Sequence, residues 1–115
     1  TGDHGLIVDG YVVNASAMVN GSTIHSVPLS DLPAEFSWWH IETEAHEVIL
    51  AEGAAAETFI DAAGRAAFDN HDAYLDRFGT ERLIPEMRLP RITASRLLPE
   101  SIRARLEISA ASLAA

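Results

Sequence analysis

Two tight-turn signals near the start of the chain constrain its fold more than any other feature of the sequence. Asp9-Gly10 lies between two short runs of β-forming residues, 6–8 and 11–13, and Asn20-Gly21 lies between two more. An Asp-Gly or Asn-Gly pair in this setting favours a two-residue hairpin turn, in which both central residues adopt positive φ. The sequence therefore predicts two β-hairpins by about residue 25.

A charged alternation comes next in the chain. Four polar side chains occupy alternate positions: His40, Glu42, Glu44 and His46. Successive side chains of a strand point to opposite faces, so these four would share one face of a strand. We expect strands over 36–44 and 47–51. Two interpretations stay open. One is a Zn²⁺ or Fe²⁺ site, which residues about 7 Å apart along a strand could form only with a bulge or with help from residues elsewhere. The other is a solvated sheet face.

After residue 58 the strand pattern gives way to helix-forming sequence. The Ala-rich segment 59–68 is compatible with a helix, although Gly64 weakens it. A helix is expected over 73–78, capped by the polar residues 69–72 and closed by Gly79.

The remaining segment predicts an extended linker and a final helix. Pro85 and Pro90 punctuate residues 83–92, and Pro99 suits the first turn of a helix that runs to about residue 113. One apolar stripe of that helix is formed by Ile102, Leu106 and Leu113. The fold class is therefore mainly β, with strands first and a helical tail after them.

The charge of the chain excludes several classes of partner. The formal net charge is −9, and all eight basic residues are arginines. Nucleic acid and anionic membrane surfaces call for clustered basic side chains, so neither is expected as a partner.

No apolar run approaches the roughly 20 residues that span a bilayer. The sequence contains no cysteine, so it predicts no disulfide, thiolate metal site or cysteine nucleophile, and it leaves the compartment open.

The first four residues form a second candidate site. Thr1 and His4 are spaced so that a hydroxyl and an imidazole can face one small site ahead of a strand. Such a threonine can hydrogen-bond to a peptide bond while the histidine protonates its leaving nitrogen, as in general acid catalysis. The alternative is an ordinary frayed terminus. Because the chain begins at Thr1 rather than Met, we expect it to be processed or to be a piece of a longer protein.

Taken together, two spaced blocks resemble the hedgehog/intein (Hint) superfamily of self-processing domains. The first four residues, Thr1-Gly2-Asp3-His4, are similar to its Thr-x-x-His block. The penultimate block of inteins reads two apolar or aromatic residues, Asp, an apolar residue and Glu, then His-Asn-aromatic-apolar-Leu-Ala-Asn-Gly. The similar residues here are Trp38-Trp39-His40-Ile41-Glu42 and His46-Glu47-Val48-Ile49-Leu50-Ala51-Glu52-Gly53. The resemblance covers Thr1 to Thr58, about half of the chain, and the relatives it suggests are bacterial Hint domains that carry a helical tail like the one here.

This resemblance implies a horseshoe of β-hairpins over about 1–58 and a helical C-terminal extension over 59–115. It also implies a reaction in which a nucleophile, usually Cys, attacks the carbonyl of the preceding peptide bond and turns the amide into a thioester. Thr1 and His4 match the residues that strain and protonate that bond. His40 and His46 are the candidates of the second block.

The chain departs from the family pattern at three places. The nucleophile block is missing, His40 stands where inteins have Asp, and Glu57-Thr58 stands where inteins have their closing His-Asn. Without that Asn, the resemblance implies cleavage on the N-terminal side rather than splicing.

Three hypotheses of function follow from these observations. The first is the C-terminal part of a Hint-type self-processing domain, which hydrolyses or transfers an N-terminal (thio)ester once an upstream segment of the same polypeptide supplies the nucleophile. The second is a non-catalytic β-rich interaction or secretion-associated module. The third is a metal-binding β domain that uses the four alternating residues. The first hypothesis requires no cofactor.

Overall fold

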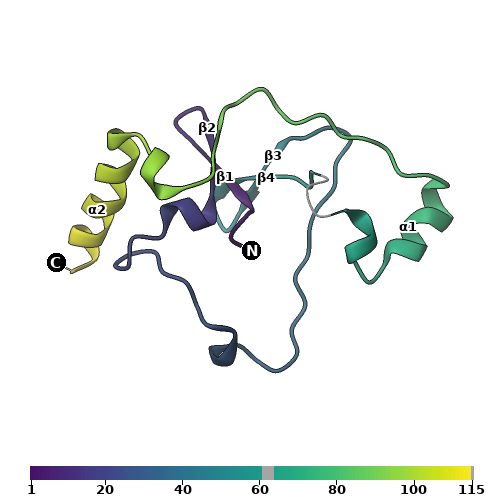
Figure 1. Cartoon of the computed structure of the whole chain (residues 1–115), viewed down its shortest axis with the longest axis horizontal. Helices are drawn as coiled ribbons and strands as arrows, with labels where there is room; N and C mark the ends of the chain where they lie inside the picture. The colour runs from purple at the N-terminus through teal and green to yellow at the C-terminus, as the bar shows by residue number, and fades with distance from the viewer. Residues whose placement is uncertain (61–63, 115) are drawn as a thin grey trace.

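Five short strands form one mixed sheet at the centre of the molecule (Figure 1). The computed structural model describes residues 1–60 and 64–114, with side chains up to residue 107. The strand order is β3-β4-β1-β2-β5, with antiparallel neighbours except for the parallel pair β2–β5. The strands are β1 (Gly5–Val8), β2 (Tyr11–Asn14), β3 (Val48–Ala51), β4 (Ala54–Glu57) and β5 (Arg91–Ile92).

The first predicted hairpin is confirmed as β1–β2. Asp9 and Gly10 have φ of 50° and 82°, and Val8 pairs with Tyr11 directly across the turn. The β3–β4 hairpin uses the same kind of turn, with φ of 52° at Glu52 and 79° at Gly53. Positive φ at both central residues matches the right-handed twist of the flanking strands, which explains why glycine occupies each second position.

The second predicted hairpin, around Asn20-Gly21, is wrong. The chain before it forms a 3₁₀ turn at Ala15–Met18, and the chain after it forms no strand. The side-chain oxygen of Asn20 instead accepts three backbone hydrogen bonds, from Ser22 (3.0 Å), Thr23 (3.1 Å) and Ile24 (3.1 Å). A local side-chain acceptor has thus taken the amide hydrogens that a strand ladder would need.

The strand predicted over 36–44 is wrong as well, whereas the one over 47–51 is confirmed by β3. Residues 36–47 have no regular secondary structure, and residues 19–47 include only a 3₁₀ turn at Leu29–Asp31. This long segment extends away from the sheet (Figure 1). The radius of gyration is accordingly 16.3 Å, against about 13 Å for a compact chain of this length.

Both predicted helices are confirmed. Helix α1 (His71–Phe78) ends at Gly79, whose N–H donates to the carbonyl of Leu75 at 2.7 Å. Helix α2 (Glu100–Ala114) follows Pro99, whose carbonyl accepts from two first-turn amides at 3.1 Å. Neither of these helices, the two that the described part of the chain contains, has the length and apolar character to cross a membrane.

The Ala-rich segment 59–68, whose sequence is compatible with a helix, does not form an α-helix in its described part. Arg65–Ala67 form a single 3₁₀ turn, and Phe59 is extended, donating its N–H to the carbonyl of Ile41 at 2.8 Å. Residues 61–63 of this segment lie outside the described residues.

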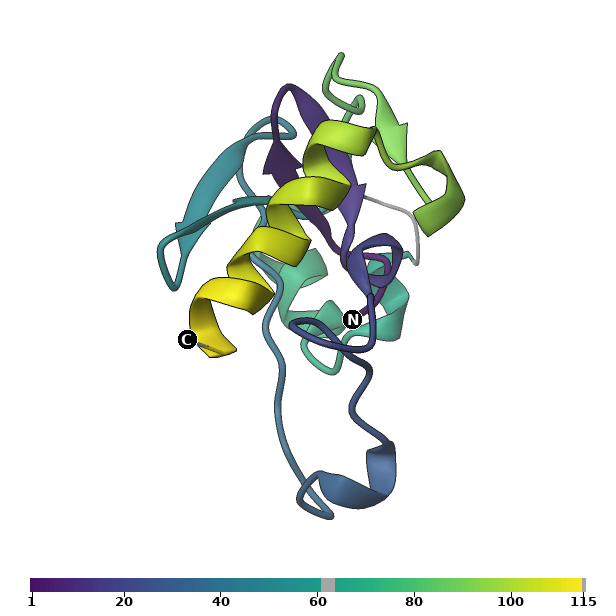
Figure 2. The same ribbon diagram turned by 90° about the vertical axis from the view of Figure 1, so that its left-hand side faces the viewer.

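The core lies between one face of the sheet and α2, which crosses the strands in Figure 2. Ile102 of α2 is 1% exposed, and Leu106 packs against the same cluster. The side chain of Leu113, the third member of the predicted stripe, lies outside the described side chains. The buried members of the core are Val13, Ala17, Met18, Ile92 and Ile102.

The end of the predicted linker is part of the sheet. Val12 and Val13 of β2 pair with Arg91 and Ile92 of β5, and the N–H of Val12 donates to the carbonyl of Pro90 at 2.9 Å. A strand from the C-terminal half therefore completes the sheet that the N-terminal half begins.

Candidate active site

The side chain of Glu57, the last residue of β4, is the centre of a buried polar network. Glu57 is 4% exposed. One carboxylate oxygen accepts from the N–H of Gly5 (2.6 Å) and from Nη1 of Arg91 (3.1 Å). The other accepts from Nη2 of Arg91 (2.5 Å) and from Nε2 of His46 (2.8 Å). Arg91 thus binds the carboxylate with both prongs of its guanidinium, the strongest geometry for such a pair.

These donors keep the Glu57 carboxylate ionised. Burial raises the pKa of Glu57, but hydrogen bonds from Arg91, Gly5 and His46 lower it by more, and the net pKa lies below the ordinary value of 4.5. A buried carboxylate is stable only when charged donors and N–H groups replace its water. The contacts around Glu57 supply them.

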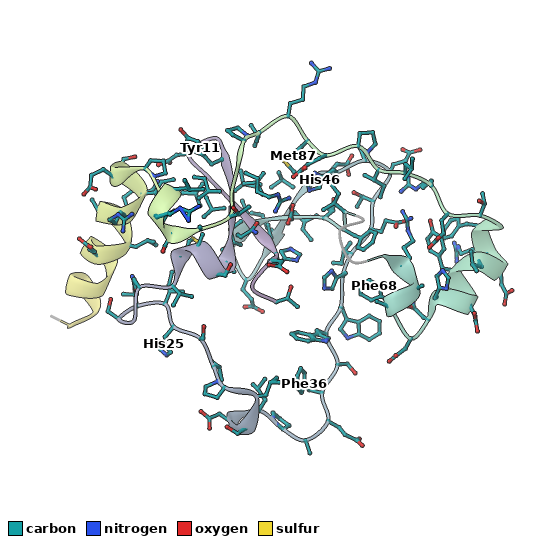
Figure 3. The ribbon with its side chains drawn as sticks, in the orientation of Figure 1. Tyr11, His25, Phe36, His46, Phe68 and Met87 are labelled. Carbon is teal, nitrogen blue, oxygen red and sulfur yellow. The ribbon has the colours of Figure 1, made fainter. Side chains whose placement is uncertain are left out.

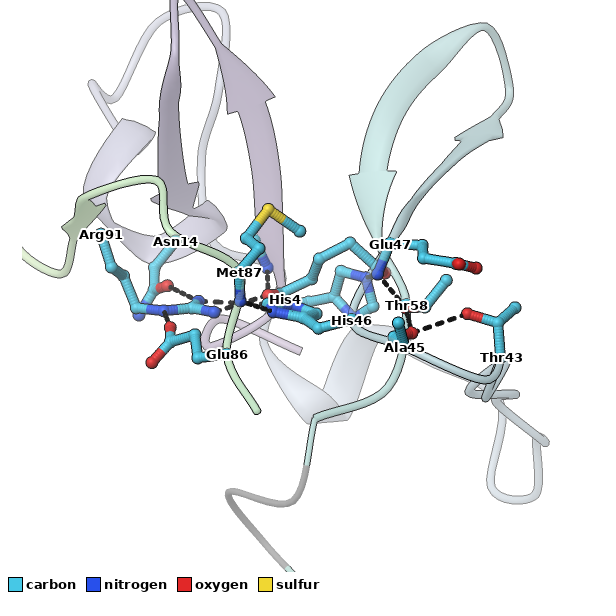
Figure 4. Close-up of polar contacts among 12 residues, drawn as sticks. His4, Asn14, Thr43, Ala45, His46, Glu47, Thr58, Glu86, Met87 and Arg91 are labelled. Carbon is cyan, nitrogen blue, oxygen red and sulfur yellow. Dashed lines mark hydrogen bonds and ion pairs between the residues drawn. The ribbon is translucent and has the colours of Figure 1, made fainter. Parts of the chain in front are cut away.

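His46 is held at both ring nitrogens. Its side chain is 0% exposed, and the N–H of Met87 donates to Nδ1 at 2.8 Å. Since Nδ1 accepts, Nε2 carries the hydrogen that is donated to Glu57. Figure 4 draws His46 and Met87 among the residues of the network. His46 therefore joins the network and does not line the neighbouring cleft.

His4 lies on the other side of Glu57, at the wall of that cleft. Its Nε2–H donates to the backbone carbonyl of Glu57 at 2.9 Å, which leaves Nδ1 as the ring nitrogen with no hydrogen bond among the described residues. The turn before it is closed by a hydrogen bond from the N–H of His4 to the carbonyl of Thr1 at 3.2 Å. Thr1 and His4 line the same cleft, as the spacing of the first block predicts.

His40 also lines this cleft and lies edge-on to His4, with ring centroids 5.6 Å apart. The rings of Phe68 and Phe59 contact it at centroid distances of 5.0 and 6.4 Å. Burial lowers the pKa of His40, and the charge of His4 lowers it further. His40 is therefore a neutral imidazole at neutral pH, able to accept a proton.

The cleft itself is large, and several of its lining residues are aromatic. Its volume is about 640 Å³, and the indoles of Trp38 and Trp39 remain 58% and 83% exposed. Figure 3 shows that Phe36 comes from the long loop and Phe68 from the segment before α1. Besides Thr1, His4 and His40, its walls include Asp3, Phe36, Ser37, Trp38, Trp39, Phe59, Phe68 and Asp69.

The four alternating residues do not share a face. His40 faces the cleft, His46 is buried beside Glu57, and Glu42 accepts from Nε of Arg65 at 2.6 Å. The guanidinium of Arg82 donates to the carbonyls of Thr43 and Glu44, so a side chain provides the contacts that a neighbouring strand would have provided. Within the described residues, no three histidine or carboxylate side chains come together as a metal site would require.

Sequence reasoning missed the partners of the network. The family pattern places Glu57 only as the replacement of an intein histidine, although a charged residue at the end of the apolar strand β4 is a usable signal. Arg91 and Asn14, joined at 2.7 Å, had no signal, because only the fold brings them together.

Comparison with protein families gave a match over the first half of the chain. The family model described as the Hint domain matches residues 3–63, which is more than half of the chain. The comparisons with curated proteins and with solved structures gave no match. The matched segment contains His4, His40, His46 and Glu57, whereas Arg91 lies beyond it.

Proposed function

The chain belongs to the Hint domain family, and on that premise we propose that it supplies the proton-transfer groups of a self-processing site that cleaves a peptide bond on its N-terminal side. The nucleophile belongs, in this proposal, to an upstream segment of the same polypeptide. The products are a released N-terminal portion and the remaining Hint portion.

One observation carries the proposal: two imidazoles of different character meet at one cleft. His4 is anchored through Nε2, with Nδ1 left for exchange, and His40 has a lowered pKa. Their ring centroids are 5.6 Å apart, so a single reacting group can lie within reach of both. Cleavage of an amide requires a proton donor and a proton acceptor close to the reacting bond.

The reaction follows from these roles. His40 takes the proton of the nucleophile's thiol or hydroxyl, which attacks the carbonyl carbon of the peptide bond. The carbon–nitrogen bond then breaks as the imidazolium of His4 gives its Nδ1 proton to the leaving nitrogen, and a thioester or ester forms. Water or a second nucleophile attacks that intermediate and releases the N-terminal portion. Thr1, at the same wall of the cleft, is placed to hydrogen-bond to the strained peptide bond.

The residues at the intein closing position support an ending without splicing. Glu57 is 4% exposed and Thr58 is 1% exposed. The Thr58 hydroxyl accepts a hydrogen bond from the backbone N–H of Glu47 at 2.8 Å (Figure 4). The backbone N–H of Thr58 donates to the carbonyl of Glu47, also at 2.8 Å. Neither side chain is the asparagine that forms a succinimide, and both residues are held in place by these hydrogen bonds, so the proposed reaction ends at the N-terminal cleavage.

The test is intact-mass spectrometry of the parent polypeptide with its upstream segment. Wild type is compared with His4→Ala, His40→Ala and the control His25→Ala, which changes an exposed histidine of the loop in Figure 3. We expect fragments from wild type and the control, and cleavage slowed by about 10²-fold or more in the other two. Unchanged cleavage in His4→Ala or His40→Ala would contradict the assigned role. Intact wild-type protein would favour the non-catalytic interaction module.

A further inference from the structure

We propose that Arg91, acting through Glu57, is a positioning residue for His4, which makes the segment beyond the Hint match a working part of the site. The inference rests on the proposed function. It concerns a residue of β5, far from His4 in the sequence and close to it in the fold.

The first step is the fixation of Glu57. The Arg91 guanidinium is itself held on three sides: Nε donates to Glu86 (2.7 Å), Nη1 to Asn14 (2.7 Å) and Nη2 to Glu57 (2.5 Å). β5 is in turn fixed by its pairing with β2. A planar fork anchored in this way leaves the carboxylate of Glu57 one orientation.

The second step leads from Glu57 to His4 along two routes. The Glu57 carboxylate accepts from the N–H of Gly5, the residue that follows His4, at 2.6 Å. The Glu57 carbonyl accepts from Nε2 of the His4 ring at 2.9 Å. The β1–β4 ladder pairs Leu6 with Ala56, and next to that pair these two contacts take the place of further ladder bonds.

The third step concerns which nitrogen of His4 reacts. A carbonyl can only accept, so the contact requires hydrogen on Nε2 whether the ring is neutral or charged. The proton that is exchanged therefore resides on Nδ1. If Glu57 shifts, the ring loses this restraint, and both nitrogens compete for the proton. Arg91 thus controls both the position of the ring and its tautomer.

The close fit at Gly5 shows how little room the arrangement has. A Cβ on Gly5 would lie 2.8 Å from Oε1 of Glu57 and 2.4 Å from Cγ1 of Val12. The carboxylate reaches the backbone beside His4 only because residue 5 has no side chain. A displacement of about 1 Å at a reacting group can slow a reaction by about 10²-fold.

The experiment uses Arg91→Gln, Arg91→Lys and the control Arg88→Gln, which changes an exposed arginine of the same segment. In the parent polypeptide, single-turnover cleavage rates are measured across pH. In the 115-residue chain, ¹⁵N NMR of the His4 imidazole reports the tautomer. We expect Arg91→Gln to slow cleavage about tenfold or more, with an intermediate effect of Arg91→Lys, which keeps the charge but loses the fork. The control stays within about twofold.

The NMR signals separate positioning from general stability. We expect wild type to show one His4 tautomer with hydrogen on Nε2, and folded Arg91→Lys to show averaged nitrogen shifts. Folded Arg91 variants with wild-type cleavage and an unchanged His4 tautomer would overturn the inference. If wild type does not cleave, the proposed function fails, and the tautomer comparison still decides whether Arg91 positions His4. If Arg91→Gln unfolds, Arg91→Lys carries the test.

Discussion

His46 and His40, two histidines of the same short segment, have opposite environments. The contrast distinguishes a histidine that stabilises the structure from one that is placed to exchange protons. His46 is 0% exposed at its side chain and is bonded at both nitrogens. His40 faces an aromatic cleft and contacts rings at its edges, with a lowered pKa. On the buried side of Glu57, where His46 lies, both imidazole nitrogens are hydrogen-bonded. On the cleft side, where His4 and His40 lie, Nδ1 of His4 has no hydrogen bond among the described residues. A fully bonded imidazole gives rigidity, and an imidazole with a free nitrogen can exchange protons.

Substitution of the buried histidine should have the largest effect on stability. We expect His46→Ala to lower the free energy of unfolding by about 2–4 kcal/mol, because it leaves the Met87 N–H and one Glu57 oxygen buried without a partner. His40→Ala, at the cleft, should cost no more than about 1 kcal/mol. Urea unfolding followed by circular dichroism measures both variants. Equal losses of unfolding free energy in His46→Ala and His40→Ala would contradict the contrast between the two histidines.

The contact between Glu57 and the backbone beside His4 can be tested with a methyl group. Gly5→Ala places a Cβ 2.4 Å from Cγ1 of Val12 and 2.8 Å from Oε1 of Glu57. We expect a loss of about 1–3 kcal/mol from overpacking. In the matched control Gly2→Ala, the new Cβ has Ser16 Cβ as its nearest neighbour at 3.2 Å, and the loss should stay below about 0.5 kcal/mol. Comparable urea midpoints for both variants would show that the fit at Gly5 is looser than described.

Acid should weaken the buried side through Glu57. Its folded pKa lies below the ordinary 4.5, so its stabilising contribution is complete above that value and is lost as the pH falls through the folded pKa. Urea midpoints from pH 7 to pH 3 should therefore fall less steeply below pH 4.5 in Glu57→Gln than in wild type. Exposed Glu47→Gln serves as the control and should follow wild type. If the urea midpoints of wild type and Glu57→Gln fall in parallel with pH, Glu57 is not the acid-sensitive group.

The cleft side should tolerate change with the smallest effect on stability. Trp39 is 83% exposed, and Trp39→Ala should alter the free energy of unfolding by no more than about 0.5 kcal/mol. In the parent polypeptide, the same change should slow cleavage several-fold, because it removes a wall of the cleft. Leu83→Ala, which changes a residue that is 89% exposed and outside the cleft, should change neither quantity. A large loss of stability in Trp39→Ala would place this indole among the structural residues.

Local chemistry made about half of the fold predictable. Asp9-Gly10 specified a hairpin and Gly79 a helix end, because each acts within a few residues. Asn20 misled for the same reason: its side chain competed with the backbone for nearby amides, and that outcome is not visible in a turn signal. The alternation at 36–44 misled because no neighbouring strand pairs with it, and a strand needs such a neighbour.

The sequence by itself determined the Asp9-Gly10 turn, the two helices and the family blocks that contain His4, His40 and His46, since these depend on local spacing. The tertiary structure alone decided which histidine is buried and which faces the cleft. It also brought Arg91 of β5 to Glu57 of β4 at 2.5 Å. That contact depends on β5 pairing with β2 across a long stretch of chain, and no local pattern records the pairing of distant strands.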